Sequence, residues 1–323
     1  MKLFKLIPDN TNIKFLRWRV PFYAVSLLLM AASFALVFTK GLNLGVDFVG
    51  GQSIRVTFAE GTVAPLAEVR EEIDGLGYGD PILQQLGQPN QIAVRMKLPD
   101  EENPALTEKM NTDIRSTLER NHPDAQIGQA ESVSGKVSQE LFRNGMVALL
   151  LAMIGISIYI WIRFEWQFGV GALFALAHDV TLTVGLFSLT GMEFDLNIVA
   201  SLLTLIGYSL NDNIVVYDRV RENLKKYRKM PVPELLDLSV NETLSRTVVT
   251  STSLLITLVA LLLLGPEVIF GFTLAITFGI FVGTYSSIYM ATPILVWLGV
   301  KQDSFVPTES VADRQDRKAR GEA

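Results

Sequence analysis

Three consecutive polar residues, Asn211, Asp212 and Asn213, lie within the otherwise apolar helix predicted from Ser201 to Arg221. A carboxylate at membrane depth costs a few kcal/mol, so it normally faces a partner or a water-filled path. The alternative is a helix end whose acid reaches water. About five residues, or roughly 7–8 Å of helix, lie between Asp212 and the polar Asp218, and the short side chain of Asp212 cannot extend to the interface as Lys does. We therefore expect Asp212 to carry a coupling ion, with Asn211 and Asn213 beside it.

A second polar pattern begins at Arg246 and continues at helical spacing along the next apolar run through Thr250, Ser253 and Thr257. One interpretation of Arg246 is a basic anchor at the membrane surface. In the other, its long side chain extends inward and meets Asp212 if the two helices pack together, while the hydroxyl groups carry a file of water. We place Arg246 and Thr250 with Asp212 in a predicted proton path.

His178 and Asp179 lie near the middle of another apolar run. Adjacent helical positions are about 100° apart, so the two side chains need not share a partner. Gly171, Ala175, Asp179 and Thr183 follow at four-residue intervals, which favours close packing with Asp179 turned inward. Two interpretations stay open: a buried, hydrogen-bonded structural pair and a proton relay.

The last apolar run carries small residues at four-residue intervals, a spacing that predicts a tight helix-packing seam. Its members are Gly271, Ala275, Gly279, Gly283, Ser287 and Ala291. We expect Gly279, Gly283 and Ser287 to lie at the centre of this seam.

Several kinds of site are excluded by composition. The sequence has no cysteine and two histidines, so disulfides, thiolate ligands and a histidine-based metal site are absent. The polar part of the chain contains no nucleophile elbow or phosphate loop. We therefore expect no enzymatic activity and no cofactor. The coupling ion is expected to be a proton, with sodium as the alternative because the oxygens of residues 211–213 suit a hard cation.

The elements that must position these residues are membrane spans. Of the 323 residues, 49% are hydrophobic, and they gather in long runs typical of a polytopic α-helical membrane protein. The first run, 20–38, is interpreted as an uncleaved anchor rather than a signal peptide. Five further spans are predicted within 142–298: Phe142–Trp161, Phe168–Leu189, Leu196–Tyr217, Thr247–Leu264 and Phe270–Leu298.

Between the first two spans lies a polar segment, 40–139, which opens with GLNLGVDFVGG. Its patterns alternate in the order β-α-β-β-α-β, which predicts one small α+β domain of the ferredoxin-like kind. The expected elements are QSIRVTF, Ala64–Leu76, PILQQLG, QIAVRMKL, Pro104–Arg120 and Ala125–Val133. We expect this domain to bind or to act mechanically.

Lys and Arg are distributed unequally among the loops. The segment 1–19, the loops near Arg163 and Lys226 and the tail 301–323 are basic, whereas the loops Gly191–Asp195 and Gly265–Glu267 contain no Lys or Arg. By the positive-inside rule both termini are cytoplasmic and the 40–139 domain is periplasmic. The tail is expected to be disordered.

Five segments in this order resemble the SecF family: GVDFVGG, RFEW, ALAHDV, IGYSLNDNIVVYDRVREN and SVNETLSRTVVTS. The resemblance covers the chain from Trp18 to about Lys301. It implies an accessory to the bacterial Sec translocase, within the resistance-nodulation-division superfamily, that uses the proton motive force to assist protein export across the inner membrane. The family's membrane acid falls on Asp212 and its arginine on Arg246.

The resemblance also implies partners. SecD should supply a second six-helix half and the larger external domain, and SecYEG and exported polypeptides should be contacted; no nucleic acid is expected. Two rival functions remain at this point: one half of a small-molecule efflux pump, which the small external domain opposes, and a scaffold in which Asp212 is replaceable. An intramembrane hydrolase lacks a nucleophile or metal-ligand set.

Overall fold

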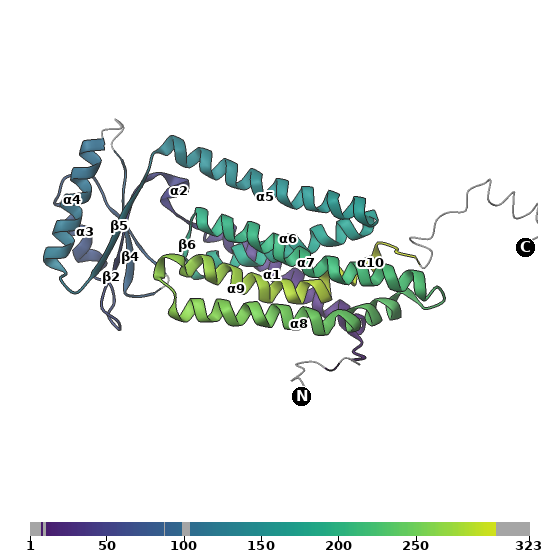
Figure 1. Ribbon diagram of the computed structural model, residues 1–323. Helices are drawn as coiled ribbons and strands as arrows, with labels where there is room; N and C mark the ends of the chain where they lie inside the picture. The colour runs from purple at the N-terminus through teal and green to yellow at the C-terminus, as the bar shows by residue number, and fades with distance from the viewer. Residues whose placement is uncertain (1–7, 9–10, 87, 99–103, 302–323) are drawn as a thin grey trace, which may run out of the picture.

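The computed structural model of the chain describes residue 8 and residues 11–86, 88–98 and 104–301. Long helices form a bundle, and a small sheet domain caps one end of it (Figure 1). Within the described residues, 6 helical segments are long and apolar enough to cross a membrane. The predicted six-span protein with one α+β domain is confirmed. Of the predicted tail, only residue 301 is described.

Three of the long helices form the centre of the bundle and three flank it. Buried residues make up 56%, 50% and 61% of the most apolar window of α6, α7 and the α9 segment, against 17% in α1, α5 and α8. The flanking helices therefore present apolar side chains to the membrane. The bounds are α1 (Arg19–Thr39), α5 (Gly135–Arg163), α6 (Trp166–Thr190), α7 (Leu196–Lys226), α8 (Val232–Leu264) and α9 (Phe270–Ser286).

The hairpin of α7 and α8 extends well beyond the spans predicted for it. The predicted spans end at Tyr217 and begin again at Thr247, whereas α7 continues to Lys226 and α8 starts at Val232. The added turns are amphipathic, so their charged residues lower the mean hydropathy and no long apolar run marks these turns in the sequence. Their apolar faces share one core, which includes Val220, Leu224, Leu235, Leu236 and Val240.

The predicted sixth span, Phe270–Leu298, contains three successive helical segments. α9 is followed by a π-helix, η3 (Ser287–Ala291), and then by the short α10 (Ile294–Trp297). Pro293 explains the break, because it donates no backbone hydrogen bond and its ring clashes with the preceding turn. Hydroxyl groups of Tyr23 and Tyr217 donate to the carbonyls of Met290 and Ala291 within η3.

The described residues just before α1 dock on α8. A short 3₁₀-helix, η1 (Phe15–Trp18), precedes α1, and both Phe15 and Leu16 are buried. Backbone N–H groups of Ile13 and Leu16 donate to the side chains of Asn241 and Asp237, each at 2.9 Å. This contact involves the part of α8 that precedes the predicted span.

The sheet domain has the predicted β-α-β-β-α-β order. All neighbouring strands are antiparallel, in the order β3-β4-β2-β5, which is the ferredoxin-like arrangement. Both helices cover the face directed away from the bundle (Figure 1). Their apolar sides meet Ile54, Val56, Ile92 and Val94 in one core. The elements are β2 (Gly51–Thr57), α3 (Leu66–Asp74), β3 (Ile82–Gln85), β4 (Gln91–Met96), α4 (Pro104–Asn121) and β5 (Gln126–Val133).

Two linkers meet between the domain and the bundle. The short strands β1 (Asn43–Leu44) and β6 (Glu193–Phe194) pair in parallel, although neither was predicted. A single helical turn, α2 (Val46–Val49), then leads to Gly50 and Gly51, whose φ angles are 72° and 104°. These left-handed conformations explain why glycines occupy both positions.

Candidate functional site

The side chains of Asp212 and Asn213 are buried in the middle of α7. Asp212 is 3% exposed and Asn213 is fully buried. The Oδ2 atom of Asp212 and both polar atoms of the Asn213 amide have no hydrogen-bond partner. Buried polar groups are normally paired, and an unpaired one costs roughly 1–3 kcal/mol. This cluster is therefore a place where water or an ion is expected to enter.

The other members of the predicted proton path lie on uncovered surfaces. Asn211, Arg246 and Thr250 are exposed in the isolated chain. α7 and α8 pack against each other, yet within the described residues Arg246 and Asp212 form no ion pair. The hydroxyl of Thr250 donates to the carbonyls of Arg246 and Thr247, both at 3.0 Å. Exposed polar groups at membrane depth indicate that another chain or water covers this face.

Asp179 has a different environment, because its carboxylate is well paired. Oδ2 accepts hydrogen bonds from Ser209 at 2.6 Å and from Ser286 at 2.9 Å, while Oδ1 lies 3.0 Å from Nδ1 of His178. All four side chains are almost completely buried. The network joins α6, α7 and α9, which are the three central helices. On the other side of the ring, Nε2 of His178 has no partner.

The small residues of α9 face α7 of the same chain. A Cβ atom added at Gly279 would lie 2.5 Å from Cδ2 of Leu205, and one at Gly283 would lie 3.4 Å from both Asp179 Oδ2 and Ser209 Cβ. Ser287 is fully buried. Gly283 thus lets α9 approach closely enough for Ser286 to reach Asp179.

A hydroxyl chain beside Asp212 was not identified from the sequence. Tyr208 donates to Ser251 at 3.2 Å, and Thr284 donates to the same oxygen at 2.8 Å. Tyr208 precedes Asp212 by one helical turn, so both side chains lie on the same side of α7. Because Ser251 and Thr284 come from α8 and α9, no sequence pattern within one helix predicts this row of hydroxyl groups.

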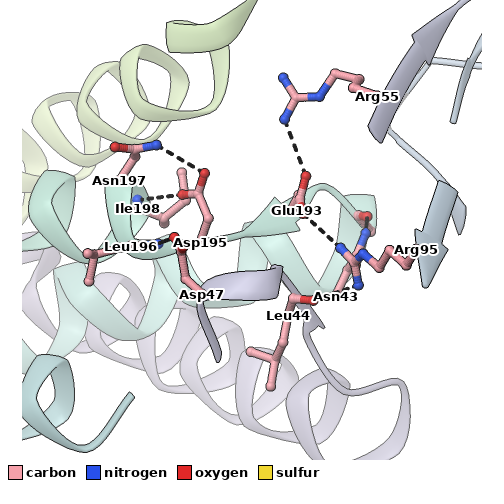
Figure 2. A network of polar contacts seen from close by, with 11 residues as sticks. Asn43, Leu44, Asp47, Arg55, Arg95, Glu193, Asp195, Leu196, Asn197 and Ile198 are labelled. Atoms are coloured by element: carbon pink, nitrogen blue, oxygen red, sulfur yellow. Dashed lines mark hydrogen bonds and ion pairs between the residues drawn. The ribbon is translucent and has the colours of Figure 1, made fainter. Parts of the chain in front are cut away.

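A second polar network lies where the sheet domain meets the bundle (Figure 2). Glu193 forms one ion pair with Arg95 at 2.8 Å and another with Arg55 at 3.3 Å. Glu193 was not predicted from the sequence, since its only local signal is one acid between two apolar spans. Asp195 caps α7 by accepting from Ile198 N–H at 3.0 Å, and Asp47 accepts from Leu196 N–H at 2.9 Å.

Asp195 is the titratable group of this junction whose environment is most unusual. Burial raises its pKa above the ordinary value, and the nearby Glu193 and Asp47 raise it further, while hydrogen bonds from Ile198 and Asn197 oppose the shift. The described residues contain no group of three or more His, Asp or Glu side chains arranged to hold a metal ion.

Comparison with known proteins relates these features to one family. The family described as "Protein export membrane protein SecD/SecF, C-terminal" matches residues 104–301, and the "SecD/SecF GG Motif" matches residues 35–61. The second match includes the two left-handed glycines at the start of β2.

Curated relatives match over almost their whole length. A protein translocase subunit SecF from Cereibacter sphaeroides is 44% identical over 317 residues, which are 94% of this chain and 97% of the relative. The protein translocase subunit SecF from Pseudomonas aeruginosa is 38% identical over 306 residues, covering 95% and 98%.

Solved structures agree in fold. SecDF, a translocon-associated membrane protein from Thermus thermophilus, superimposes with a TM-score of 0.79 at 36% identity, over 91% of this chain and 39% of that chain. A structure of SecDF in a super-membrane-facing form gives 0.64 at 33% identity, over 99% and 41%. The chain thus spans about two fifths of these SecDF chains. By sequence and by fold, the chain belongs to the SecD/SecF family of protein-export membrane proteins.

Proposed function

We propose that this chain is a SecF-type subunit of a protein translocase and that it couples proton movement through the bacterial inner membrane to protein export. The observation that carries the proposal is the buried, incompletely paired carboxylate of Asp212 inside a bundle that spans the membrane. A charged side chain at membrane depth costs free energy, so its presence favours a role in ion passage over a role in packing. No bond is made or broken, and the chain acts as a transporter component rather than an enzyme.

The proposed mechanism is an exchange of a proton at Asp212. A carboxyl group in an apolar environment favours its neutral form, whereas a nearby guanidinium favours the ionised form. Arg246, on the exposed side of the neighbouring helix α8, supplies that cation when a rearrangement brings it closer to Asp212. The Tyr208–Ser251–Thr284 hydroxyls and water at the unpaired Asn213 amide offer hydrogen-bonding groups next to the acid.

A partner chain completes the path in this proposal. Asn211, Arg246 and Thr250 are uncovered here, and the SecDF chains are more than twice as long as the part this protein matches. We infer that a SecD-like chain covers this face, and that the complex works with the SecYEG channel and the exported polypeptide. The basic loops favour cytoplasmic termini and a periplasmic sheet domain.

Two rival functions are weaker. An efflux half-transporter needs an external chamber for its substrate, and the single four-stranded domain packs its apolar face under its own two helices. A scaffold has no need of an unpaired buried carboxylate. Sodium remains the alternative coupling ion.

The test is reconstitution. Inverted membrane vesicles that lack this chain should show little gradient-stimulated export, and supplying the chain with its copurified SecD-like partner should restore the stimulation in sodium-free buffer. If the chain copurifies with no SecD-like protein, or if adding the complex leaves export unchanged, the proposal is wrong.

A further inference from the structure

The sheet domain is joined to the bundle at two covalent points that lie side by side. The chain enters the domain at Gly50–Gly51 and leaves it at Ser134–Gly135, where α5 begins. Gly51 pairs with Val133, and a Cβ atom on Gly50 would lie only 2.9 Å from Cα of Gly135. Two connections so close together form a hinge, and a few such residues are enough to absorb a rotation. The covalent chain alone therefore leaves the rotation of the sheet unfixed.

The ion pairs to Glu193 lie away from this hinge. Arg55 is four residues beyond Gly51 along β2, a distance of about 13 Å at the rise of a strand. Arg95 lies on the neighbouring strand β4, paired with Ser53. Both arginines project from the uncovered face of the sheet toward the loop that carries Glu193 (Figure 2). A contact at this distance from a hinge line fixes the rotation about it.

Arg95 makes the stronger of the two contacts. Its guanidinium donates to Glu193 at 2.8 Å, to the carbonyl of Leu44 at 2.6 Å and to Oδ1 of Asn43 at 3.2 Å. The Arg95 and Glu193 side chains are only 11% and 13% exposed. Exposed ion pairs contribute little to stability. A mostly buried guanidinium that donates to a carboxylate and to two further acceptors contributes more. Arg55 is 33% exposed and lies at 3.3 Å, so we expect a smaller contribution from it.

The loop that receives the arginines is also fixed to the start of α7. β6 holds Glu193 and pairs with β1, and the next residue after β6 is Asp195, the N-cap of α7. Asp47 from the other linker accepts the N–H of Leu196, the first residue of that helix. A displacement at Glu193 is therefore passed directly to the amino end of α7. The same helix carries Asp212, about 25 Å further along.

We propose that Glu193 is a positioning residue: through Arg95 and Arg55 it makes the sheet domain and the amino end of α7 move as one body. This inference rests on the proposed function, because it gives the buried acid of α7 a mechanical connection to the domain that would contact exported polypeptide. Without the Glu193 contact, Arg95 keeps its bonds to Leu44 and Asn43 of β1 but the direct connection to β6 is lost. The domain then rotates more freely on its glycine hinge, and changes at Asp212 reach it less fully.

The first measurement tests the geometry. Because the sequence has no cysteine, labels can be placed at two introduced cysteines only, Gln129→Cys and Val268→Cys. These residues line the cavity of about 360 Å³ between the sheet and the turn before α9. We expect one narrow distribution of spin-label distances in the otherwise unchanged complex and a broad one after Glu193→Gln. A distribution that stays narrow overturns the proposal.

The matched control is Glu131→Gln. It removes the same charge from a side chain that lines the same cavity, but within the described part of the chain Glu131 forms no ion pair with the bundle. The control should keep the narrow distribution and wild-type export. Glu193→Gln should keep export without a gradient and lose most of the gradient-stimulated part.

A chemical bridge separates positioning from any direct role of the carboxylate. The variant with Arg95→Cys and Glu193→Cys, without the two labelling cysteines, should lose gradient stimulation, and a short bifunctional thiol reagent that joins the two cysteines should restore it. Complete cross-linking without restored stimulation contradicts the inference. Asp212→Asn is measured alongside: if it exports normally the proposed function fails, whereas a failing Asp212→Asn with a normal Glu193→Gln refutes only the positioning role.

Discussion

At the scale of single residues, the two buried acids of the bundle have opposite environments. Asp179 is paired with His178, Ser209 and Ser286, whereas one oxygen of Asp212 has no partner. A satisfied carboxylate that joins three helices favours the structural interpretation of the His178–Asp179 pair. An unsatisfied one favours ion exchange. The sequence left both roles open for Asp179, because its two serine partners come from other helices.

A prediction follows for the Asp179 network. Ser286→Ala removes one hydrogen bond to the carboxylate and should lower the free energy of unfolding by about 1.5–3 kcal/mol, the usual range for bonds to charged groups. Ser253→Ala, on the exposed face of α8, should be nearly neutral. Thermal unfolding of the purified proteins in detergent measures the difference. Equal losses in the two variants would contradict a structural role for the network.

The N-cap of α7 gives a prediction about pH. The pKa of Asp195 is raised, chiefly by burial, so the folded protein binds its proton more tightly than the unfolded chain does. Stability from this group is therefore greatest at low pH and falls as pH rises above the ordinary Asp value of about 3.9. Asp195→Asn keeps a good cap without the charge. It should raise the unfolding temperature at neutral pH, with no gain near pH 4.

A gain from Asp195→Asn that is the same at both pH values would show that burial of the charge is not its cause. A loss at neutral pH would show that the charge itself stabilises the helix end.

At the scale of elements, most of the fold was predictable and the exceptions have physical causes. Helix and strand periodicity predicted the six spans and the ferredoxin-like order, because both depend on residues close in sequence. The charged face of α8 hides its extension to Val232, and Pro293 ends the regular helix before α10. The β1–β6 pair depends instead on contacts between distant segments. The same applies to Glu193, whose partners Arg95 and Arg55 lie 98 and 138 residues earlier in the sequence.

The α7–α9 contact supports a prediction on glycine. Gly279→Ala places a methyl group where Leu205 already lies, and overpacking of this kind costs about 1–3 kcal/mol. Gly155→Ala, on α5 with no atom within 4 Å of the added carbon, should instead stabilise its helix by up to about 1 kcal/mol. Unfolding temperatures should move in opposite directions. A stabilised Gly279→Ala would mean that the helices pack less tightly than described.

At the scale of the whole molecule, the chain corresponds to about two fifths of the SecDF chains that it matches. Its central helices carry the polar groups, its flanking helices face lipid, and one polar face is left uncovered beside Asp212. The sheet domain stands at the opposite end of α7 from the hairpin that joins α7 to α8 (Figure 1). This arrangement suits a proton-driven change in the membrane that is converted into movement outside it.

The most direct test of this account is gradient-stimulated export by Asp212→Asn. The variant keeps the size of the side chain and a hydrogen-bonding group but cannot ionise, so it should assemble with its partner at wild-type levels and lose the stimulation. Asp218→Asn, the same change at an exposed position on α7, is the control and should export normally. Export into inverted vesicles is measured with and without a proton gradient in sodium-free buffer. Wild-type stimulation in Asp212→Asn would show that the carboxylate is structural and would contradict the account.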